Sequence, residues 1–300
     1  MSTQNYKSQV ILLLSVLPEV EKEDCFALHG GTAINLFVRN MPRLSVDIDL
    51  TFLPIENRDT SIQAISKALS QIKKNIETVF SHISVQHLER EAKLLVSTKE
   101  ANIKIEVNLI KRACFEKPKL MALCAKAQDT FEVFTEITIV ELGHLFGGKI
   151  CAALDRQHPR DLFDIKYLLE EEGFSAAIKK GFIFYLISSN RPIVEILFPK
   201  LKDQRKAFSN QFTGMTTENF DYSDYEHTRE TLIQIVNSSL TKEDKAFLLS
   251  IEKGEPNWNE YDFSQFPAVK WKLQNINTLK EQNPVKHKEF YEKLYLAFKD

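Results

Sequence analysis

The apolar residues of the chain follow two different patterns, one in each half. In the first 140 residues, stretches with apolar side chains at every second position alternate with stretches of helical spacing. The expected elements are a helix at 4–17 ended by Pro18, a strand at 25–28, a helix at 32–39, a strand at 46–53, a helix at 59–75, two strand-like runs within 79–96, a strand at 102–110 and one or two short strands at 131–140. This mixture predicts a small mixed sheet flanked by helices.

From residue 141 onward the apolar pattern is mostly helical. Two helices are expected at 142–156 and 160–171, and polar or loop-like stretches at 214–223 and 254–262 divide the rest into several helices. The sequence therefore predicts the α+β class. A first domain at 1–172 holds the sheet and the two helices that follow it, and a helical bundle domain occupies 173–300.

Composition and charge fall in the ordinary globular range and exclude a few classes of protein. The 39 basic and 41 acidic residues give a net charge of −2, which rules out a globally basic nucleic-acid binder but permits a local basic patch. The four cysteines have no C-x-x-C spacing, so neither a zinc site nor a redox motif is indicated. The apolar run at 10–14, extended by Val16 and Leu17, is far too short to cross a bilayer, and we expect a cytoplasmic protein.

The first candidate site joins a glycine turn to a pair of aspartates. Gly30 and Gly31 precede an expected helix, where backbone N–H groups can bind phosphate and Thr32 can add a hydroxyl donor. Asp47 and Asp49 lie two residues apart on an expected strand, so their carboxylates share its polar face and can bind a divalent cation. Each piece alone is usually structural, but together they favour metal-dependent chemistry on a nucleoside triphosphate.

Glu106 offers a third carboxylate on the polar face of the strand at 102–110. If that strand lies beside the one with Asp47 and Asp49, three carboxylates can hold two Mg²⁺ or Mn²⁺ ions about 3.5–4 Å apart, as in phosphoryl transfer. One ion then activates the attacking hydroxyl, and the other binds the triphosphate.

A second group of charged residues lies at 147–169. Lys149 falls in one expected helix, and Arg160, Asp161 and Asp164 fall in the first turn of the next. A lysine can neutralise triphosphate charge and an arginine can bind phosphate through both ends of its guanidinium group. The structural alternative is a set of ion pairs at helix ends, with Asp161 paired to Arg156 or Arg160.

Three further features carry less weight. His29 can touch a ligand or pack at the end of its strand. Basic residues outnumber acidic ones at 101–126, which suggests either a phosphate-binding strip for RNA or a solvated face. Tyr222 and Tyr225 lie in a polar segment where they can meet a base or a partner, although most aromatic residues of this half are expected in the core.

Three segments together resemble a known family. The pair HGGTAINLF and LSVDIDLTF, the strand IKIEVN and the segment GKICAALDRQHPRDLFDIKYLL are similar to the AbiEii/AbiGii toxin family of nucleotidyltransferases, and FLLSIEKGEPNW and FPAVKWKLQNI resemble its C-terminal part. The resemblance implies a DNA polymerase β-type nucleotidyltransferase domain at 1–172. It also implies a bacterial toxin–antitoxin or phage-abortive system, and related MenT toxins add pyrimidine nucleotides to the 3′ end of tRNA.

The resemblance also assigns roles to residues. Gly30 and Gly31 match the Gly-Gly/Gly-Ser signature of the superfamily, and Asp47 with Asp49 match its metal-binding D-x-D. The other matches are Glu106 at the third acidic position, Lys149 at the lysine of the later motif, and Asp161 with Asp164 at its R-D-x-x-D, which begins at Arg160.

The leading hypothesis is thus a metal-dependent nucleotidyltransferase toxin that uses an NTP, releases pyrophosphate and transfers NMP to an RNA 3′ end, with tRNA as the expected acceptor. Glu106 would help to deprotonate the acceptor hydroxyl, Lys149 would steady the triphosphate, and a cognate antitoxin is expected from the resemblance. The alternatives are nucleotidylation of a small molecule or protein, and a non-catalytic module that binds a nucleotide or a partner. The basic strip at 101–126 argues against a cationic small-molecule substrate.

Overall fold

The computed structural model describes residues 3–299, which form two compact units. The first unit holds the residues up to Glu141 together with Lys206–Asn219, and the second holds Leu142–Arg205 and the residues from Phe220 onward. The α+β class predicted from the sequence is confirmed. The chain divides at 141/142 rather than at the predicted 172/173, because the helix that begins at Leu142 packs closely against later helices.

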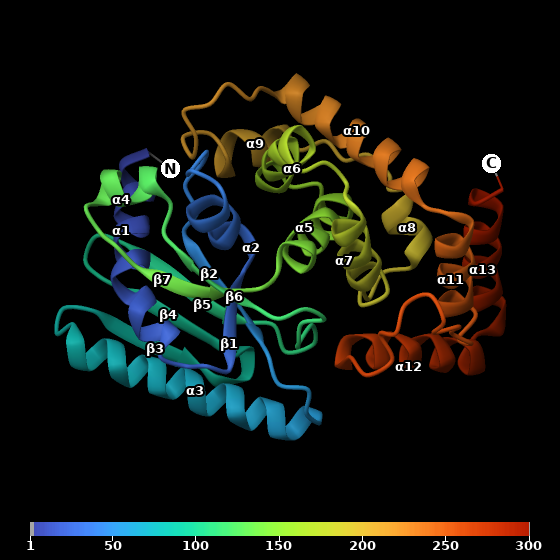
Figure 1. Ribbon diagram of the computed structural model, residues 1–300, viewed down its shortest axis with the longest axis horizontal. Helices are drawn as coiled ribbons and strands as arrows, with labels where there is room; N and C mark the ends of the chain where they lie inside the picture. Colours follow the sequence, from blue (N-terminus) through green and yellow to red (C-terminus); the bar gives the residue numbers. More distant parts are fainter. Residues whose placement is uncertain (1–2, 300) are drawn as a thin grey trace. The chain divides into compact units, whose positions relative to one another are not determined.

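A seven-stranded mixed sheet forms the centre of the first unit (Figure 1). Its strands are, in spatial order, β3 (Ser84–Leu88), β4 (Lys93–Ser97), β5 (Asn102–Val107), β2 (Asp47–Phe52), β1 (Phe26–His29), β7 (Glu136–Ile139) and β6 (Lys119–Ala122). The pairs β2–β5 and β1–β7 are parallel, and the other pairs are antiparallel. The two strands predicted from strict alternation, β2 and β5, therefore lie side by side.

Two long helices cover the apolar face of this sheet. Helix α1 (Thr3–Glu21) contacts β5 and β7, and α3 (Arg58–Val79) contacts β3 and β4, while the two helices also touch each other (Figure 1). The prediction that Pro18 ends the first helix is wrong, because α1 continues through it to Glu21. Burial of Leu17 and Val20 on either side of the proline offsets the hydrogen bond that the proline cannot make.

The remaining helices of the first unit are short. They are α2 (Gly30–Thr32), which continues directly into the π-helical turn η1 (Ala33–Val38), the 3₁₀ turn η2 (Glu89–Glu91) between β3 and β4, and α4 (Ala125–Phe131). Helix α9 (Arg205–Gln211) begins the segment by which the chain returns to this unit. That segment is held by Leu44 N, which donates to Met215 O at 2.7 Å, and by Thr216 Oγ1, which donates to Pro42 O at 2.7 Å.

The second unit is entirely helical. Its helices are α5 (Leu142–Arg156), α6 (Pro159–Glu171), α7 (Ala176–Leu186), α8 (Ile193–Leu197), α10 (Tyr222–Ser239), α11 (Lys242–Glu252), α12 (Pro267–Gln282) and α13 (Pro284–Ala297). Helices α5 and α7 make the most extensive helix–helix contact (Figure 1). A Cβ atom at Gly147 or Gly181 would collide with the backbone of the other helix, so both glycines are needed for this close approach.

Candidate active site

Four polar residues form a row across the polar face of the sheet. His29 of β1 stands opposite Asp49 of β2, Asp49 stands beside Glu106 of β5, and Glu106 stands opposite Lys93 of β4. Residues in register on neighbouring strands are about 4.8 Å apart and share one face. The predicted adjacency of Glu106 to the aspartates is therefore present, and Asp47 begins the same strand as Asp49.

The glycine turn approaches this row directly. Gly30 has φ +74°, and a Cβ atom at this position would collide with the Asp49 carboxylate. Only glycine meets both conditions without strain, because L-residues rarely adopt this backbone region and no side chain fits the space. The start of the helix at Gly30 thus lies against a carboxylate that faces the polar side of the sheet.

The turn is fixed by hydrogen bonds to its surroundings. Thr32 is fully buried, and its hydroxyl donates to Asp47 O at 2.5 Å and lies 3.0 Å from Ser45 Oγ. The amide of Asn35 donates to Gly31 O at 2.9 Å. In this arrangement the Thr32 hydroxyl positions the start of β2 and does not face solvent, so its contact with a triphosphate stays a prediction.

Arg43 is a further polar residue at the turn, and the sequence reasoning missed it. Its side chain is buried, and a Cβ atom on Gly31 would lie 2.8 Å from Arg43 Nη2. Arg43 Nη1 donates to Leu44 O at 2.9 Å. The only signal in the sequence was a basic residue in the short link between the glycine turn and the aspartate pair.

Lys93 was also missed, because it belongs to a strand whose pairing with β5 is not visible in the sequence. Its Nζ atom lies 3.1 Å from Glu106 Oε1 and 3.1 Å from Glu91 Oε2. These two carboxylates, Glu91 more than Glu106, raise the pKa of Lys93. The Glu106 carboxylate is therefore held by a cation of the chain itself.

This ion pair bears on the predicted metal site. Among residues 3–299, no group of three or more histidine, cysteine, aspartate or glutamate side chains is arranged to hold a metal ion. The donors still suit Mg²⁺, since it prefers oxygen ligands and commonly binds through one or two carboxylates together with substrate phosphates. Asp47 and Asp49 are the candidates for that pair, and the Glu106 carboxylate is bonded to Lys93. Binding of a metal ion by these three carboxylates stays a prediction.

The second predicted group forms a buried ionic network in the helical unit. Lys149 Nζ lies 2.9 Å from Asp161 Oδ1 and 2.9 Å from Asp164 Oδ2. Arg156 donates through Nε and Nη2 to the two carboxylate oxygens of Asp161. The structural alternative of an Arg156–Asp161 ion pair is thus present, and Lys149 is part of the same network.

The electrostatics of this network follow from its burial. Burial alone would raise the pKa of Asp161, but the charge of Lys149 and the bidentate bond from Arg156 hold it well below its usual range. Arg160 is half-buried at the start of α6, where its backbone N–H donates to His158 Nδ1 at 3.2 Å. Contact of Lys149, Arg160, Asp161 or Asp164 with a nucleotide stays a prediction.

The weaker sequence signals have mixed outcomes. Of the basic residues at 101–126, Arg112 is buried, whereas Lys126 is exposed and its Nζ donates to Met41 O at 3.2 Å. Tyr225 is fully buried, and its hydroxyl donates to the backbone carbonyl of Gln157 at 2.9 Å. Tyr222 stacks on Tyr225 and bonds to Gln204 N, so both rings have structural roles.

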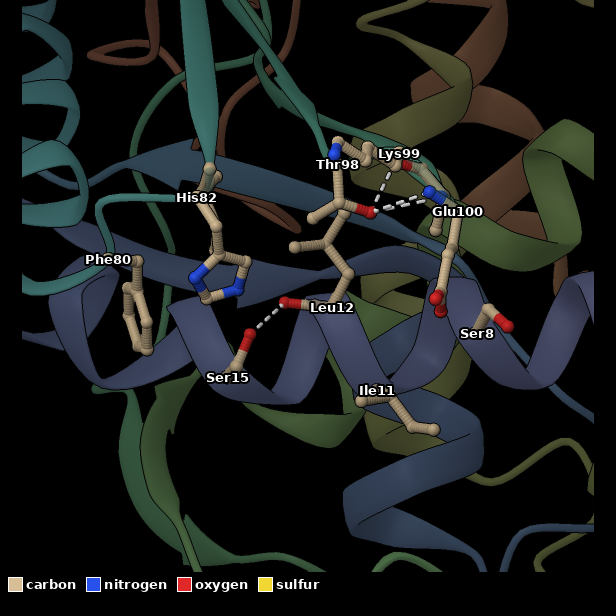
Figure 2. A pocket seen from close by; sticks show the side chains of 11 residues that line it. Ser8, Ile11, Leu12, Ser15, Phe80, His82, Thr98, Lys99 and Glu100 are labelled. Atoms are coloured by element: carbon tan, nitrogen blue, oxygen red, sulfur yellow. Dashed lines mark hydrogen bonds between the residues drawn. The ribbon is translucent and has the colours of Figure 1, made fainter.

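The first unit has a hollow of about 820 Å³, and Figure 2 shows the side chains that line it. It is lined by α1, the segment around His82 and the turn at 98–101, where Thr98 Oγ1 accepts the backbone N–H groups of Glu100 and Ala101. Ala101 precedes β5, whereas Glu106 is near its end, about 16 Å further along at the usual rise of a strand. This hollow is therefore separate from the candidate active site.

Comparisons with known proteins give one matching family and one similar fold. A family model described as the nucleotidyl transferase AbiEii toxin of a type IV toxin–antitoxin system matches residues 11–275. The fold is similar to that of MenT4, a nucleotidyltransferase toxin from Mycobacterium tuberculosis H37Rv, with 14% sequence identity, a TM-score of 0.61 and coverage of 91% of this chain and 92% of that one. Curated proteins give no significant match. Within residues 3–299, every helix is too short or too polar to span a membrane.

Proposed function

The chain belongs to the AbiEii family of nucleotidyltransferase toxins of type IV toxin–antitoxin systems, and we propose that it is a metal-dependent enzyme that transfers NMP from an NTP to the 3′ end of an RNA, with tRNA as the acceptor. The placement of Gly30 against Asp49 is the observation that carries the proposal. It sets the open end of a helix, suited to phosphate, beside a carboxylate suited to Mg²⁺.

Asp47 and Asp49 would hold the metal ion, and Gly30 and Gly31 would let the backbone approach the triphosphate. Mg²⁺ or Mn²⁺ bound there would polarise phosphoryl oxygens and neutralise their charge. Asp49 would keep its orientation through the close packing against Gly30, and the bond from the Thr32 hydroxyl to the Asp47 carbonyl would hold the backbone at the start of β2. Such contacts reduce the reorganisation needed when a substrate binds.

Glu106 would receive the proton of the acceptor hydroxyl as it attacks the α-phosphorus atom of the NTP. The new bond joins the 3′ oxygen of the RNA to that phosphorus, and pyrophosphate leaves. The partly exposed carboxylate of Glu106 is bonded to Lys93, which keeps it on the polar face beside Asp49. Lys149, Arg160, Asp161 and Asp164 would contribute to nucleotide binding. For this, the Lys149 ammonium group would leave one of its two ion-pair partners, Asp161 or Asp164, and bind phosphate instead.

An RNA acceptor is supported by the resemblance to toxins that act on tRNA. A cognate antitoxin belongs to the proposal because the family description places its members in toxin–antitoxin systems. Both substrates, NTP and RNA, are abundant in the cytoplasm, where we place the reaction.

The decisive experiment incubates the protein with total RNA, Mg²⁺ and each labelled NTP in turn, and then sizes the labelled product. We expect one NTP to label RNA of tRNA length. Asp49→Asn should abolish labelling and growth inhibition while the protein stays folded. Asp129→Asn, which removes an exposed carboxylate on α4, is the matched control and should retain full activity.

Full transfer by the Asp49→Asn protein would contradict the proposal. NTP binding without any labelled product would instead indicate a non-catalytic binding module. Label on a protein or a small molecule, with none on RNA, would refute the acceptor and leave the enzyme class standing.

A further inference from the structure

A second hollow, of about 420 Å³, lies within the helical unit. It is bounded by the end of α5, by α8 and the loop that follows it, and by α13. Six of its lining side chains are basic or aromatic: Arg191, Phe198, Lys200, Lys202, Phe290 and Lys293. Its volume lies within the range of about 300–1,000 Å³ that is typical of ligand sites.

The loop that carries Lys200 and Lys202 is held in one conformation. The side chain of Gln157 is fully buried, donates to Lys200 O at 2.9 Å and accepts from Lys202 N at 2.9 Å. Arg229 Nη1 donates to Lys202 O at 2.9 Å. A buried amide that satisfies both neighbouring backbone groups makes the loop rigid, so the two lysines are presented without a large entropic cost on binding.

The lining is positively charged although the whole chain is slightly acidic. Four basic side chains face two acidic ones, Asp155 and Glu195, and both of these are bonded to Arg191. Lys293 is paired with Glu289 at 2.6 Å. Among residues 3–299, Lys200 Nζ has no hydrogen bond or ion pair, and Lys202 Nζ bonds only to a backbone carbonyl, that of Asp155. The positive charge of these two lysines is therefore not neutralised by a carboxylate.

Aromatic rings lie beside this charge. Phe198 is 40% exposed, unusual for a phenylalanine next to a well-packed helix, and Phe290 of α13 lines the same hollow. Lysines next to an accessible ring are the two components with which proteins bind single-stranded nucleic acid, where the lysines contact phosphates and the ring stacks on a base.

We propose that this hollow binds a single-stranded segment of the RNA acceptor, with phosphates at Lys200 and Lys202 and a base on Phe198. The inference rests on the proposed function, since it assigns a docking site to its acceptor. An acidic peptide would also match the charge, but it would leave the exposed ring without a stacking partner.

The test measures binding of a fluorescent single-stranded RNA to the full chain by anisotropy, without NTP, over a series of salt concentrations. The double variant Lys200→Ala/Lys202→Ala should weaken binding by about tenfold or more and reduce the salt slope by about 1.4, the value for two lost phosphate contacts on a single strand. The control Lys242→Ala/Lys270→Ala removes the same charge from exposed positions outside the hollow and should bind like the wild type.

The ring is tested separately. Phe198→Ala should weaken RNA binding by about tenfold, in the range of one lost base–aromatic stack, and Phe198→Trp should restore it. Leu201→Ala is the matched control, since Leu201 is 55% exposed in the same loop but does not line the hollow. Circular dichroism and thermal melting establish that each variant is folded.

The outcomes separate this inference from the proposed function. If the wild type labels RNA but all variants bind RNA equally, the docking site is refuted and the enzyme stands. If the hollow variants lose RNA binding while no protein labels RNA, the docking site stands and the proposed reaction is refuted. Loss of affinity for an oligoglutamate peptide, with unchanged RNA affinity, would also refute the docking site.

Discussion

At the scale of single residues, the closest fit in the candidate active site is between Gly30 and Asp49. Glycine is needed at position 30 for two separate reasons: its φ is positive, and a Cβ would collide with the Asp49 carboxylate. The cost of the positive φ alone can be measured at another glycine. Gly173 also has a positive φ, +65°, but a Cβ there would meet nothing within 4 Å. The chain therefore contains its own control for backbone strain.

We expect Gly30→Ala to lower kcat/KM for nucleotide transfer by about 100-fold, because the methyl group displaces the Asp49 carboxylate and a misplacement of about 1 Å has an effect of that size. Gly173→Ala should cost about 1–2 kcal/mol of stability from the same backbone strain but leave kcat/KM unchanged. Steady-state kinetics and thermal melting of both variants test this. Equal activity of the two variants would show that Gly30 is needed only for the backbone conformation of the turn.

The buried carboxylate of Asp161 predicts a dependence of stability on pH. Its folded-state pKa is below that of the unfolded chain, so the ion pairs with Lys149 and Arg156 stabilise the fold above about pH 3.9, the unfolded value, and this stability is lost as the pH falls further. We expect Asp161→Asn to cost about 3–5 kcal/mol at pH 7, because it leaves Lys149 buried with one partner fewer.

Denaturant unfolding at pH 7 and at pH 3 measures this difference. The difference in free energy of unfolding between the wild type and Asp161→Asn should be smaller at pH 3 than at pH 7. Asp155→Asn removes an exposed partner of Arg191 and should change stability by less than about 1 kcal/mol at either pH. A gap that does not vary with pH would show that the ion pairs are not its source.

At the scale of elements, the contact between α5 and α7 depends on two glycines. A Cβ on Gly181 would collide with the backbone of Gly143, and backbone atoms cannot move aside as a flexible side chain can. We expect Gly181→Ala to destabilise the helical unit by about 1–3 kcal/mol. Trp258 and Trp271 both belong to this unit, so tryptophan fluorescence reports its unfolding alone. An unchanged unfolding midpoint of Gly181→Ala would show that α5 and α7 can move apart without loss of stability.

Periodicity predicted the elements that form the candidate active site better than those around it. Alternation placed β2 and β5 correctly, and the Gly-Gly turn placed the start of the helix that follows β1. The edge strand β6 and helix α4 were not predicted, because β6 is largely exposed and has no apolar alternation. Lys93 reaches the site through the pairing of β4 with β5. The segment at Arg43 is held by the returning segment, through the bond from Leu44 N to Met215 O. Both depend on contacts between residues distant in sequence.

At the scale of the whole molecule, the first unit is built from two separate parts of the chain. Phe212 and Met215 of the returning segment are buried, and Met215 O accepts the backbone N–H of Leu44, next to Arg43. The helices at 142–205 are thus an insertion between the parts of the first unit. This explains why a boundary after 172, chosen from the sequence pattern, differs from the division in space.

We expect Met215→Ala to destabilise the first unit by about 2–5 kcal/mol, the usual cost of removing a buried methionine side chain. Hydrogen exchange should accelerate in peptides from β1, β2 and β5 and stay unchanged in the helical unit. Leu201→Ala changes an exposed residue before the returning segment, and hydrogen exchange in both units should stay as in the wild type. Equal acceleration in both units would show that they unfold together.

The returning segment also sets an order of events on the ribosome. Everything in the first unit except Lys206–Asn219 is synthesised before residue 142, yet the strand pairing at Arg43 and Thr216 must wait for more than sixty further residues. At roughly 5–20 residues per second, that delay lasts several seconds. A nascent chain of this toxin would therefore hold its glycine turn and aspartates in an unfinished unit until translation is past residue 216. A chain truncated earlier would lack the hydrogen bonds that join Met215 to Leu44 and Thr216 to Pro42.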